Sequence, residues 1–201
     1  MAVDAVRVFL ILSGSSLMLW AGDCVPTGTA AHPTEVSPDG RYRLLNLRCS
    51  NPTQEERGAL VLVETKGGAR RTVYTYNREA TALWSPDSQH VAVNDYIGSN
   101  VSQSLVLSVS GKAPPINVSE RVLQAMSGDD IRKADHLYVS VVRWRSGDEL
   151  ELIAFGHTSE RENPTKGFCL CFSVTLEGTV QQRRLPDTGP DLEGYCWKLA
   201  K

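Results

Sequence analysis

The chain has 201 residues, a formal net charge of −2, 41% hydrophobic residues and 22% charged residues. This length suits one domain with a well-formed core. The near-neutral charge gives no electrostatic basis for binding nucleic acid or an anionic membrane surface. The basic pairs Arg70-Arg71 and Arg183-Arg184 are therefore expected to be solvated strand ends.

The first 31 residues are predicted to be a signal peptide and leader, and residues 32–201 a single domain. Residues 8–20 form an apolar run, broken by Ser13-Gly14-Ser15-Ser16, that is short for a membrane span. Such a run is typical of a secretory signal, although Asp4 is unusual in the start of one. The alternative is a buried first helix or strand of a cytoplasmic protein.

Two sites for processing lie in this leader. Thr29-Ala30-Ala31 offers small residues for cleavage, and residues 19–24 resemble a bacterial lipoprotein signal apart from Asp23. Cys24 is therefore a candidate for lipid attachment, which would hold the protein on a membrane surface. Residues 23–38 are rich in Pro, Thr, Gly and Ala, and we expect a flexible leader with order beginning near Val36.

Two similar turns each precede an apolar strand. They are Ser37-Pro38-Asp39-Gly40 and Trp84-Ser85-Pro86-Asp87-Ser88, with their serines 48 residues apart. Proline presets φ for a tight turn, and the serine and aspartate oxygens can satisfy turn amides. Gly40 supplies the permissive backbone that Ser88 replaces in the second copy.

The strand after the second turn alternates in polarity. Val91 and Val93 point to one face, and His90, Ala92 and Asn94 point to the other. This period of two predicts a strand with one buried face.

Residues 118–136 depart from the β pattern. Ser119 could cap a helix in which Val122, Leu123 and Met126 share one face, before Ser127-Gly128-Asp129-Asp130 ends it. Asp129 and Asp130 lack the ligand alternation and central glycine of a calcium loop, so a solvated turn is expected.

A third copy of the turn is predicted at Ser146-Gly147-Asp148, after Trp144 and without the proline. The helical insertion accounts for the longer spacing, 60 residues, between Trp84 and Trp144. Each copy is followed by a second apolar strand and a turn, at residues 59–64, 104–110 and 168–176. Residues 195–199 alternate like a short final strand that would complete the first sheet.

The two Ser-Pro-Asp turns resemble the core of the TolB-type β-propeller repeat, whose usual form is Trp-Ser-Pro-Asp-Gly before an apolar strand. The resemblance covers residues 36–185. It implies an all-β fold, a propeller-like array of about three four-stranded repeat units with one short helical insertion. Such repeats occur in binding scaffolds of the bacterial envelope and in propeller domains that gate some peptidases, so the resemblance implies fold more than activity.

Propellers of this type usually close with more than three blades, and closure removes exposed sheet edges. The array could therefore be incomplete, could associate with a second copy or another chain, or could pack as a sandwich or curved sheet. The polar loops at residues 51–57, 98–100 and 158–166 are expected at equivalent places in the units, where recognition usually occurs.

Five cysteines are present, and thiols of exported proteins tend to pair. Without Cys24 four remain, and disulfides are predicted among Cys49, Cys169, Cys171 and Cys196. Cys169 and Cys171 face the same side of one strand, so each is expected to take a separate partner. A zinc site using these two with His157 or Cys196 matches no usual spacing.

No cofactor or metal is expected, and the four histidines are expected at the surface. They are His32, His90, His136 and His157. The glycine-flanked serine elbow, the phosphate-binding loop and the paired-histidine zinc helix are all missing from the sequence. A peptidase-type propeller would also need a catalytic domain for which the chain has no room.

The sequence thus predicts an exported, periplasmic or extracellular, non-catalytic scaffold whose loops contact another envelope or extracellular protein. One alternative is a small hydrolase that uses two carboxylates in a cleft, and its candidate residues are Asp87, Asp95, Asp148 and Glu151. The other alternative is a propeller subunit that is closed by oligomerisation.

Overall fold

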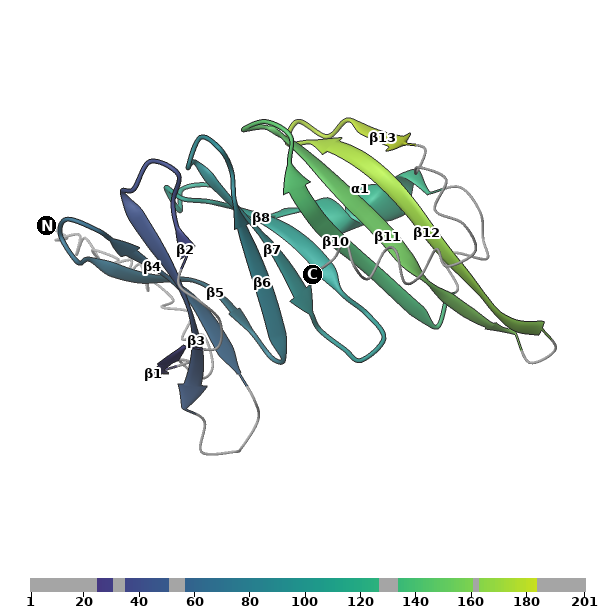
Figure 1. The fold of residues 1–201 in the computed structure, drawn as a ribbon, viewed down its shortest axis with the longest axis horizontal. Coiled ribbons are helices and arrows are strands. Elements are labelled where there is room, and N and C mark those ends of the chain that lie inside the picture. Colours follow the sequence, from purple (N-terminus) through teal and green to yellow (C-terminus); the bar gives the residue numbers. More distant parts are fainter. Residues whose placement is uncertain (1–24, 31–34, 51–56, 127–133, 161–162, 184–201) are drawn as a thin grey trace, which may run out of the picture.

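The computed structural model describes residues 25–30, 35–50, 57–126, 134–160 and 163–183. The predicted signal peptide, Cys24, Cys196, the turn at residues 127–130 and the final strand at residues 195–199 lie outside these ranges. Within them, the chain forms three antiparallel sheets that stand side by side along the long axis of the molecule (Figure 1).

The second and third sheets each have four strands in sequence order. In the first sheet, β1 and β2 both pair with β3 and together occupy the place of one strand. The first sheet has the order β1-β3-β4-β5, with β2 also paired to β3, and the other two have the orders β6-β7-β8-β9 and β10-β11-β12-β13. The first sheet contains β1 (Val25–Ala30), β2 (Glu35–Val36), β3 (Tyr42–Ser50), β4 (Gly58–Glu64) and β5 (Arg70–Tyr76). The second contains β6 (Glu79–Trp84), β7 (His90–Tyr96), β8 (Gln103–Ser108) and β9 (Ile116–Asn117). The third contains β10 (His136–Trp144), β11 (Glu149–Glu160), β12 (Asn163–Thr175) and β13 (Val180–Arg183).

The three predicted turns occupy equivalent places. Residues 37–41 connect β2 to β3, residues 85–89 connect β6 to β7, and residues 145–148 connect β10 to β11. The prediction of three four-stranded units with one short helix is therefore confirmed.

Order begins earlier than the leader composition suggested. β1 pairs with the end of β3, where Val25 is opposite Ser50, and β2 pairs with its start, where Glu35 is opposite Leu44. The expectation that order begins near Val36 was wrong, because backbone pairing with β3 holds a segment that has no apolar period of its own.

The second sheet is packed on both faces. Val91 and Val93 of β7 belong to the cluster shared with the first sheet, whereas Ala92 belongs to the cluster shared with the third. The expected solvated face of β7 is therefore buried, because the second sheet is the middle layer of the array. Between the first two sheets the packed side chains include Leu44, Leu60, Leu62, Val91, Val93 and Leu107.

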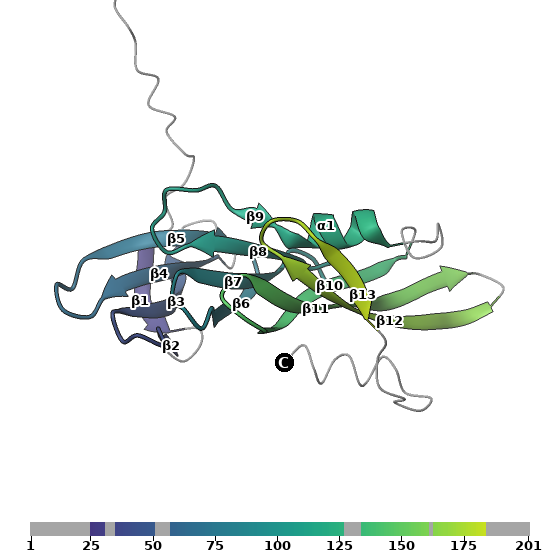
Figure 2. The ribbon, with the colours of Figure 1, turned by 90° about the horizontal axis from the view of Figure 1, so that it is seen from above.

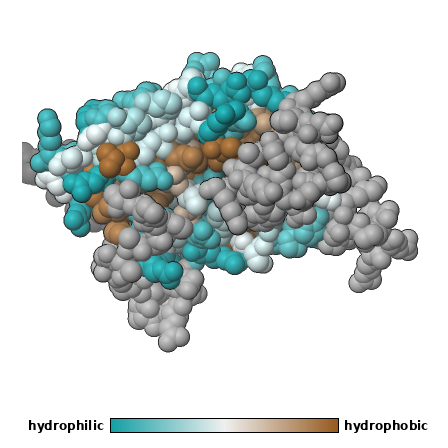
Figure 3. All heavy atoms as spheres, viewed as in Figure 1, coloured by the Kyte–Doolittle hydropathy of each residue, from teal (hydrophilic) through white to brown (hydrophobic). Residues whose placement is uncertain are grey.

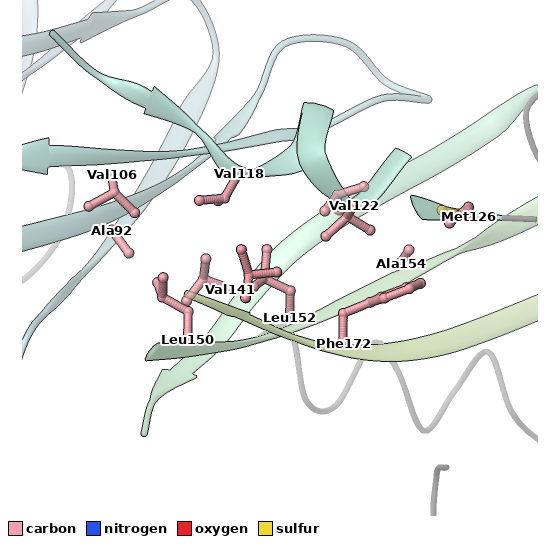
Figure 4. Close-up of a cluster of buried hydrophobic side chains, with 12 residues drawn as sticks. Ala92, Val106, Val118, Val122, Met126, Val141, Leu150, Leu152, Ala154 and Phe172 are labelled. Atoms are coloured by element: carbon pink, nitrogen blue, oxygen red, sulfur yellow. The ribbon is translucent and has the colours of Figure 1, made fainter. Parts of the chain in front are cut away.

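The largest cluster joins the second sheet, the third sheet and the helix α1 (Val118–Ala125), as Figure 4 shows. Full burial of each Val, Leu or Phe side chain contributes about 1.5–3 kcal/mol, so this cluster holds the second and third sheets together. Its members include Ala92, Val106, Val118, Val122, Met126, Val141, Leu150, Leu152, Ala154 and Phe172.

Helix α1 lies along one side of the second and third sheets (Figure 2). The helix was predicted, but its N-cap is Asn117 and not Ser119. Asn117 Oδ1 accepts a hydrogen bond from the Glu120 backbone N–H at 3.0 Å. Ser119 is buried, and its hydroxyl oxygen instead accepts from the Ser104 backbone N–H at 2.6 Å. In the parts of the chain that the structure describes, no helix has the length and apolar character needed to cross a bilayer.

Candidate functional site

The Ser-Pro-Asp turns are held by their own side chains. In the second turn, Ser85 Oγ donates to Asp87 Oδ1 at 2.6 Å and accepts from the His90 backbone N–H at 2.9 Å. The Gln89 backbone N–H donates to the same Asp87 oxygen at 3.0 Å. Partial burial of Asp87 raises the pKa of its carboxyl group, but these hydrogen bonds outweigh that effect and lower the pKa overall.

The first turn repeats this geometry. Ser37 Oγ donates to Asp39 Oδ1 at 2.8 Å and accepts from the Tyr42 backbone N–H at 3.0 Å. The Arg41 backbone N–H donates to Asp39 at 3.0 Å, and this bond is the main cause that lowers the pKa of Asp39 to about 2. Both carboxylates therefore have a structural role in their turns.

The third turn keeps the serine and the aspartate but is shorter. Ser146 Oγ donates to Asp148 Oδ1 at 2.6 Å and accepts from the Glu149 backbone N–H at 3.1 Å. This serine reaches three residues along the chain, whereas the other two serines reach five. The third copy that the sequence suggested is therefore a true equivalent that has lost its proline.

Neighbouring turns are in contact. The Asp39 backbone N–H donates to Ser88 Oγ at 3.1 Å, which connects the first turn to the second. Ser88 and Gly40 both have positive φ, 60° and 73°. This agrees with the equivalent places that the two residues occupy in the two turn sequences. Gly147 lies against Asp87, since a Cβ at Gly147 would be 2.6 Å from Asp87 Oδ2. The three motifs thus form a chain of turns at one end of the array, which we call the turn end.

The four carboxylates of the hydrolase hypothesis do not converge. Asp87 and Asp148 are held in separate turns, and Glu151 Oε2 accepts from Arg143 at 2.8 Å and from Arg145 at 3.1 Å. Asp95 is the sixth residue of β7 and lies at the opposite end of the second sheet. Nothing in this arrangement offers a pair of carboxylates across a cleft.

The opposite end of the array, which we call the loop end, carries the connections between the second and third strands of the sheets. There Asp95 is only 3% exposed, and its Oδ2 accepts from Tyr74 Oη at 2.6 Å and from Gln103 Nε2 at 3.4 Å. Its other oxygen, Oδ1, is buried without a hydrogen-bond partner. Burial, and then the hydrogen bond to Asp95, raise the pKa of Tyr74. This pair was not predicted from the sequence, because Tyr74 and Asp95 belong to different sheets.

The loop between β7 and β8 is firmly held at this end. Tyr138 Oη donates to the Ser99 carbonyl at 2.7 Å, and Asn100 Nδ2 donates to the Asp135 carbonyl at 2.9 Å. The Leu137 backbone N–H donates to the Asn100 carbonyl at 2.9 Å. The loop is therefore pinned to the start of β10.

This pinned loop displays an apolar side chain. Ile97 is 45% exposed, and Val36 of β2 is 56% exposed. These two are the large hydrophobic residues that the described part of the chain exposes. On the face shown in Figure 3, the described surface has apolar patches between hydrophilic ones.

The other two predicted loops differ in their outcomes. Residues 51–56 lie outside the described ranges. Residues 158–166 were expected to be a loop, but β11 continues to Glu160 and β12 starts at Asn163, so most of this segment is a long antiparallel hairpin.

Two histidines meet at the same end. His136 of β10 is the register partner of His157 of β11, and their ring centroids are 4.1 Å apart. The expectation of scattered surface histidines therefore fails for this pair, since both are half-buried. Only the β10–β11 register brings them together. Among the residues described, no group of three or more His, Cys, Asp or Glu side chains could hold a metal ion.

The cysteine prediction needs one correction. Cys169 and Cys171 lie on the same face of β12, as expected, but Cys171 is a buried free thiol. Burial, and then the nearby Glu151 carboxylate, raise the pKa of Cys171. Cys169 is not free. Pairing among Cys49, Cys169 and Cys196 stays a prediction, because the side chain of Cys49 and all of Cys196 lie outside the described part.

A small pocket of about 210 Å³ lies between the first two sheets, near the turn end. Its lining includes Tyr42, Glu64, Arg70 and Arg71. Arg71 donates through Nη2 to the Val109 carbonyl, so this member of the Arg70-Arg71 pair joins two sheets. The pocket contains a single carboxylate and no histidine or cysteine, so it does not assemble a catalytic pair.

Solved structures with a similar arrangement include a β-propeller domain. An acylaminoacyl peptidase from Pyrococcus horikoshii matches with a TM-score of 0.52 and 11% identity, over 78% of this chain and 25% of the peptidase. The β-propeller domain of the Trilobed protease from Pyrococcus furiosus, described as having an open velcro topology, matches with a TM-score of 0.50 and 9% identity. That match covers 76% of this chain and 43% of the protease domain.

The fold is a β-propeller array. At these identities the likeness concerns the fold alone, and the chain spans less than half the length of either structure. TolB from Acinetobacter baumannii is also similar, with a TM-score of 0.43 and 11% identity over 76% of this chain and 32% of TolB. That score is too low to support an assignment. No protein-family model matches the sequence. No curated protein matches it either.

Proposed function

We propose that this chain is an exported, non-catalytic binding protein of TolB-like β-propeller type, which contacts a protein partner through the loop between β7 and β8. The observation that carries the proposal is Ile97, an exposed isoleucine on a loop that hydrogen bonds from Tyr138, Asn100 and Leu137 hold in place. A loop that is already ordered loses little conformational entropy on binding.

The size of the expected contribution is appreciable. Burying an isoleucine side chain is worth about 1.5–3 kcal/mol, and each 1.4 kcal/mol changes an affinity by about tenfold. One well-placed apolar residue in the centre of an interface can therefore account for much of its affinity. Loops that extend from a rigid sheet are a usual place for such residues.

The positions of the four candidate carboxylates favour a binding protein over the hydrolase alternative. Asp87 and Asp148 stabilise turns, Glu151 pairs with arginines, and Asp95 accepts from Tyr74. None of the four lies opposite another across a pocket. Glycoside hydrolysis needs two such groups about 5–10 Å apart on either side of the bond.

The location of the protein is proposed from the apolar run at residues 8–20, and the partner is accordingly an envelope or extracellular protein. Attachment through a lipid on Cys24 stays a prediction. Closure of the array by a second copy or by another chain also stays a prediction.

The test is in-cell cross-linking followed by affinity capture, with the tag placed after Lys201 so that the leader is intact. Capture by the wild type is compared with capture by Ile97→Asp and by Val36→Asp. Val36 is the matched control, because it is also a β-branched aliphatic residue and is at least as exposed, but it lies on β2 near the turn end.

The proposal expects one protein to be recovered with the wild type and with Val36→Asp, and recovery to fall about tenfold or more with Ile97→Asp. Equal recovery of the same protein with all three would remove Ile97 from the interface. Recovery of the chain alone in every case would contradict a stable protein partner.

A further inference from the structure

The third sheet has an outer face that points away from the second sheet. Successive side chains of a strand leave opposite faces, so Leu152 of β11 packs toward the second sheet and its neighbour Ile153 points the other way. The apolar cluster on the outer face consists of Tyr138, Ile153, Phe155 and Cys169, with Val142 packed against it. All of these residues belong to the third sheet itself.

This outer cluster is buried. Ile153 and Phe155 are 0% exposed, and Cys169 is 7% exposed. The second sheet and α1 pack on the opposite face, and the loop between β7 and β8 touches the cluster at Tyr138, on the edge strand β10. Neighbouring side chains of one sheet cannot bury each other completely, so a further layer covers the central strands β11 and β12.

The cysteines indicate which segment forms this layer. Cys169 is not a free thiol, whereas Cys171, two residues further along the same face, is one. The remaining cysteines that could form a disulfide with Cys169 are Cys24, Cys49 and Cys196.

The first sheet is too far away to supply the partner. Cys49 is opposite Pro26 in the pairing of β1 with β3, and Cys24 directly precedes β1. A disulfide joins residues whose Cα atoms are about 4.4–6.8 Å apart, and packed sheets are already about 10 Å apart. The second sheet lies between the first and the third (Figure 1), and Cys169 faces away from it. Cys196 is therefore the partner that the topology allows.

The chain after β13 is long enough for this pairing. β13 ends at Arg183, the register partner of Cys171, so Cys169 is about 5 Å across and about 7 Å along the sheet from that end. The twelve residues 184–195 can span up to about 40 Å and can therefore turn back over the outer face. Apolar side chains flank Cys196 at Leu192, Tyr195, Trp197 and Leu199.

We propose that residues 184–201 cover the outer face of the third sheet and are held there by a disulfide between Cys169 and Cys196. The segment then caps the array where a further blade would otherwise pack. The proposal differs from the sequence-based expectation that residues 195–199 complete the first sheet.

The disulfide forms by exchange with an oxidised dithiol. The two thiols lose two protons and two electrons, and the S–S bond of the oxidant breaks and takes them up as two thiols. Oxidants of this class act outside the cytosol, so formation of the bond in cells rests on the proposed export. The position of Cys169 does not depend on export.

The first test is to map the disulfides of the purified full-length protein. The protein is incubated with oxidised glutathione, its free thiols are blocked, and the unreduced peptides are identified by mass spectrometry. Peptides that contain Cys169 and Cys196 are expected to be linked. A link between Cys49 and Cys196, or a blocked thiol at Cys169, would overturn the proposal. A failure of export alone would leave the bond reduced in cells but formed after this oxidation.

The second test asks whether the segment covers the face. Cys171 reports on this, because it is a buried thiol on the same face as Cys169. In Cys196→Ser, alkylation of Cys171 by iodoacetamide is expected to be about tenfold faster than in the wild type, since the untethered segment opens more often. Cys49→Ser is the matched control and should keep the wild-type rate. Equal rates in the wild type and Cys196→Ser, or the same increase in both variants, would overturn the proposed cover.

Discussion

The side chain of Asn94 on β7 bonds to both backbone groups of Val141 on β10. Asn94 Nδ2 donates to the Val141 carbonyl at 3.0 Å, and Asn94 Oδ1 accepts from the Val141 N–H at 2.7 Å. Val139 of β10 is bonded similarly, through both of its backbone groups. Its carbonyl accepts from the hydroxyls of Ser102 and Ser104, and its N–H donates to Ser102 Oγ. Polar side chains of β7, β8 and the loop between them thus take the place of a neighbouring strand beside Val139 and Val141 of β10.

Replacing Asn94 by alanine should therefore loosen the third sheet from the second. The variant leaves the Val141 N–H and carbonyl buried without partners, at a cost of about 1–3 kcal/mol for each group. The free energy of unfolding, measured in urea, should fall by at least that amount. Asn77→Ala is the control, because Asn77 is exposed and its replacement should change the free energy of unfolding by about 0.5 kcal/mol or less. A loss no larger than that of the control would show that Asn94 does not join the sheets.

Ser88 provides a test of the contact between the first two turns. Alanine at this position removes the acceptor for the Asp39 N–H and keeps a left-handed backbone, which costs a residue with a Cβ about 1–2 kcal/mol. Glycine also removes the acceptor but relieves that conformational cost. Ser88→Gly should therefore be more stable than Ser88→Ala by about 1 kcal/mol in chemical denaturation. The reverse order would contradict the left-handed conformation of Ser88.

Acid should weaken the chain of turns. The pKa of Asp39 is lowered to about 2 and that of Asp87 is also lowered, whereas an unfolded aspartate titrates near about 3.9. Groups with a lowered folded pKa stabilise the protein fully above the unfolded pKa, and this contribution is lost as the pH falls through the folded pKa. The urea midpoint should therefore fall between about pH 4 and pH 2.

The doubly substituted variant, with Asp39→Asn and Asp87→Asn, shows whether the turns cause this loss. Its urea midpoint should depend less steeply on pH over the same range, because neither side chain can be protonated. An acid dependence identical to that of the wild type would assign the loss to other carboxyl groups.

Cys171 should react slowly in the native protein. The thiolate is the reactive form, and burial together with the Glu151 carboxylate raises the pKa of this thiol, which is 6% exposed. Alkylation with iodoacetamide, located by peptide mass spectrometry, should be slow in buffer and fast in urea. Rapid labelling at position 171 without denaturant would contradict a buried thiol on this face of β12.

Local turn chemistry was readable from the sequence, because each Ser-Pro-Asp turn is closed by side chains within a few residues of each other. Ser85, Asp87 and His90 make their bonds with no help from another sheet. The third turn was recognisable even without proline, since Ser146 and Asp148 keep their spacing. The helix was predicted for the same reason. Its N-cap, however, is Asn117, whereas Ser119 was expected, and the Ser119 hydroxyl bonds to Ser104 instead.

Features that depend on packing between sheets could not be predicted in this way. The alternation along β7 was seen, but Ala92 is buried because a third sheet covers that face. Asp95 meets Tyr74 across two sheets, and His136 meets His157 only through the register of β10 and β11. The even number of cysteines left without Cys24 suggested a disulfide partner for Cys171. A count of cysteines carries no information about the distances between them, and Cys171 is free.

Site-specific photo-cross-linking tests the central claim most directly. A photoreactive amino acid is placed at position 97 in one variant and at position 36 in the other, and both are irradiated in living cells. A binding surface at the loop end predicts one discrete adduct from position 97 and none of that mass from position 36. No adduct from position 97, or the same adducts from both positions, would contradict a protein-binding role for the loop between β7 and β8.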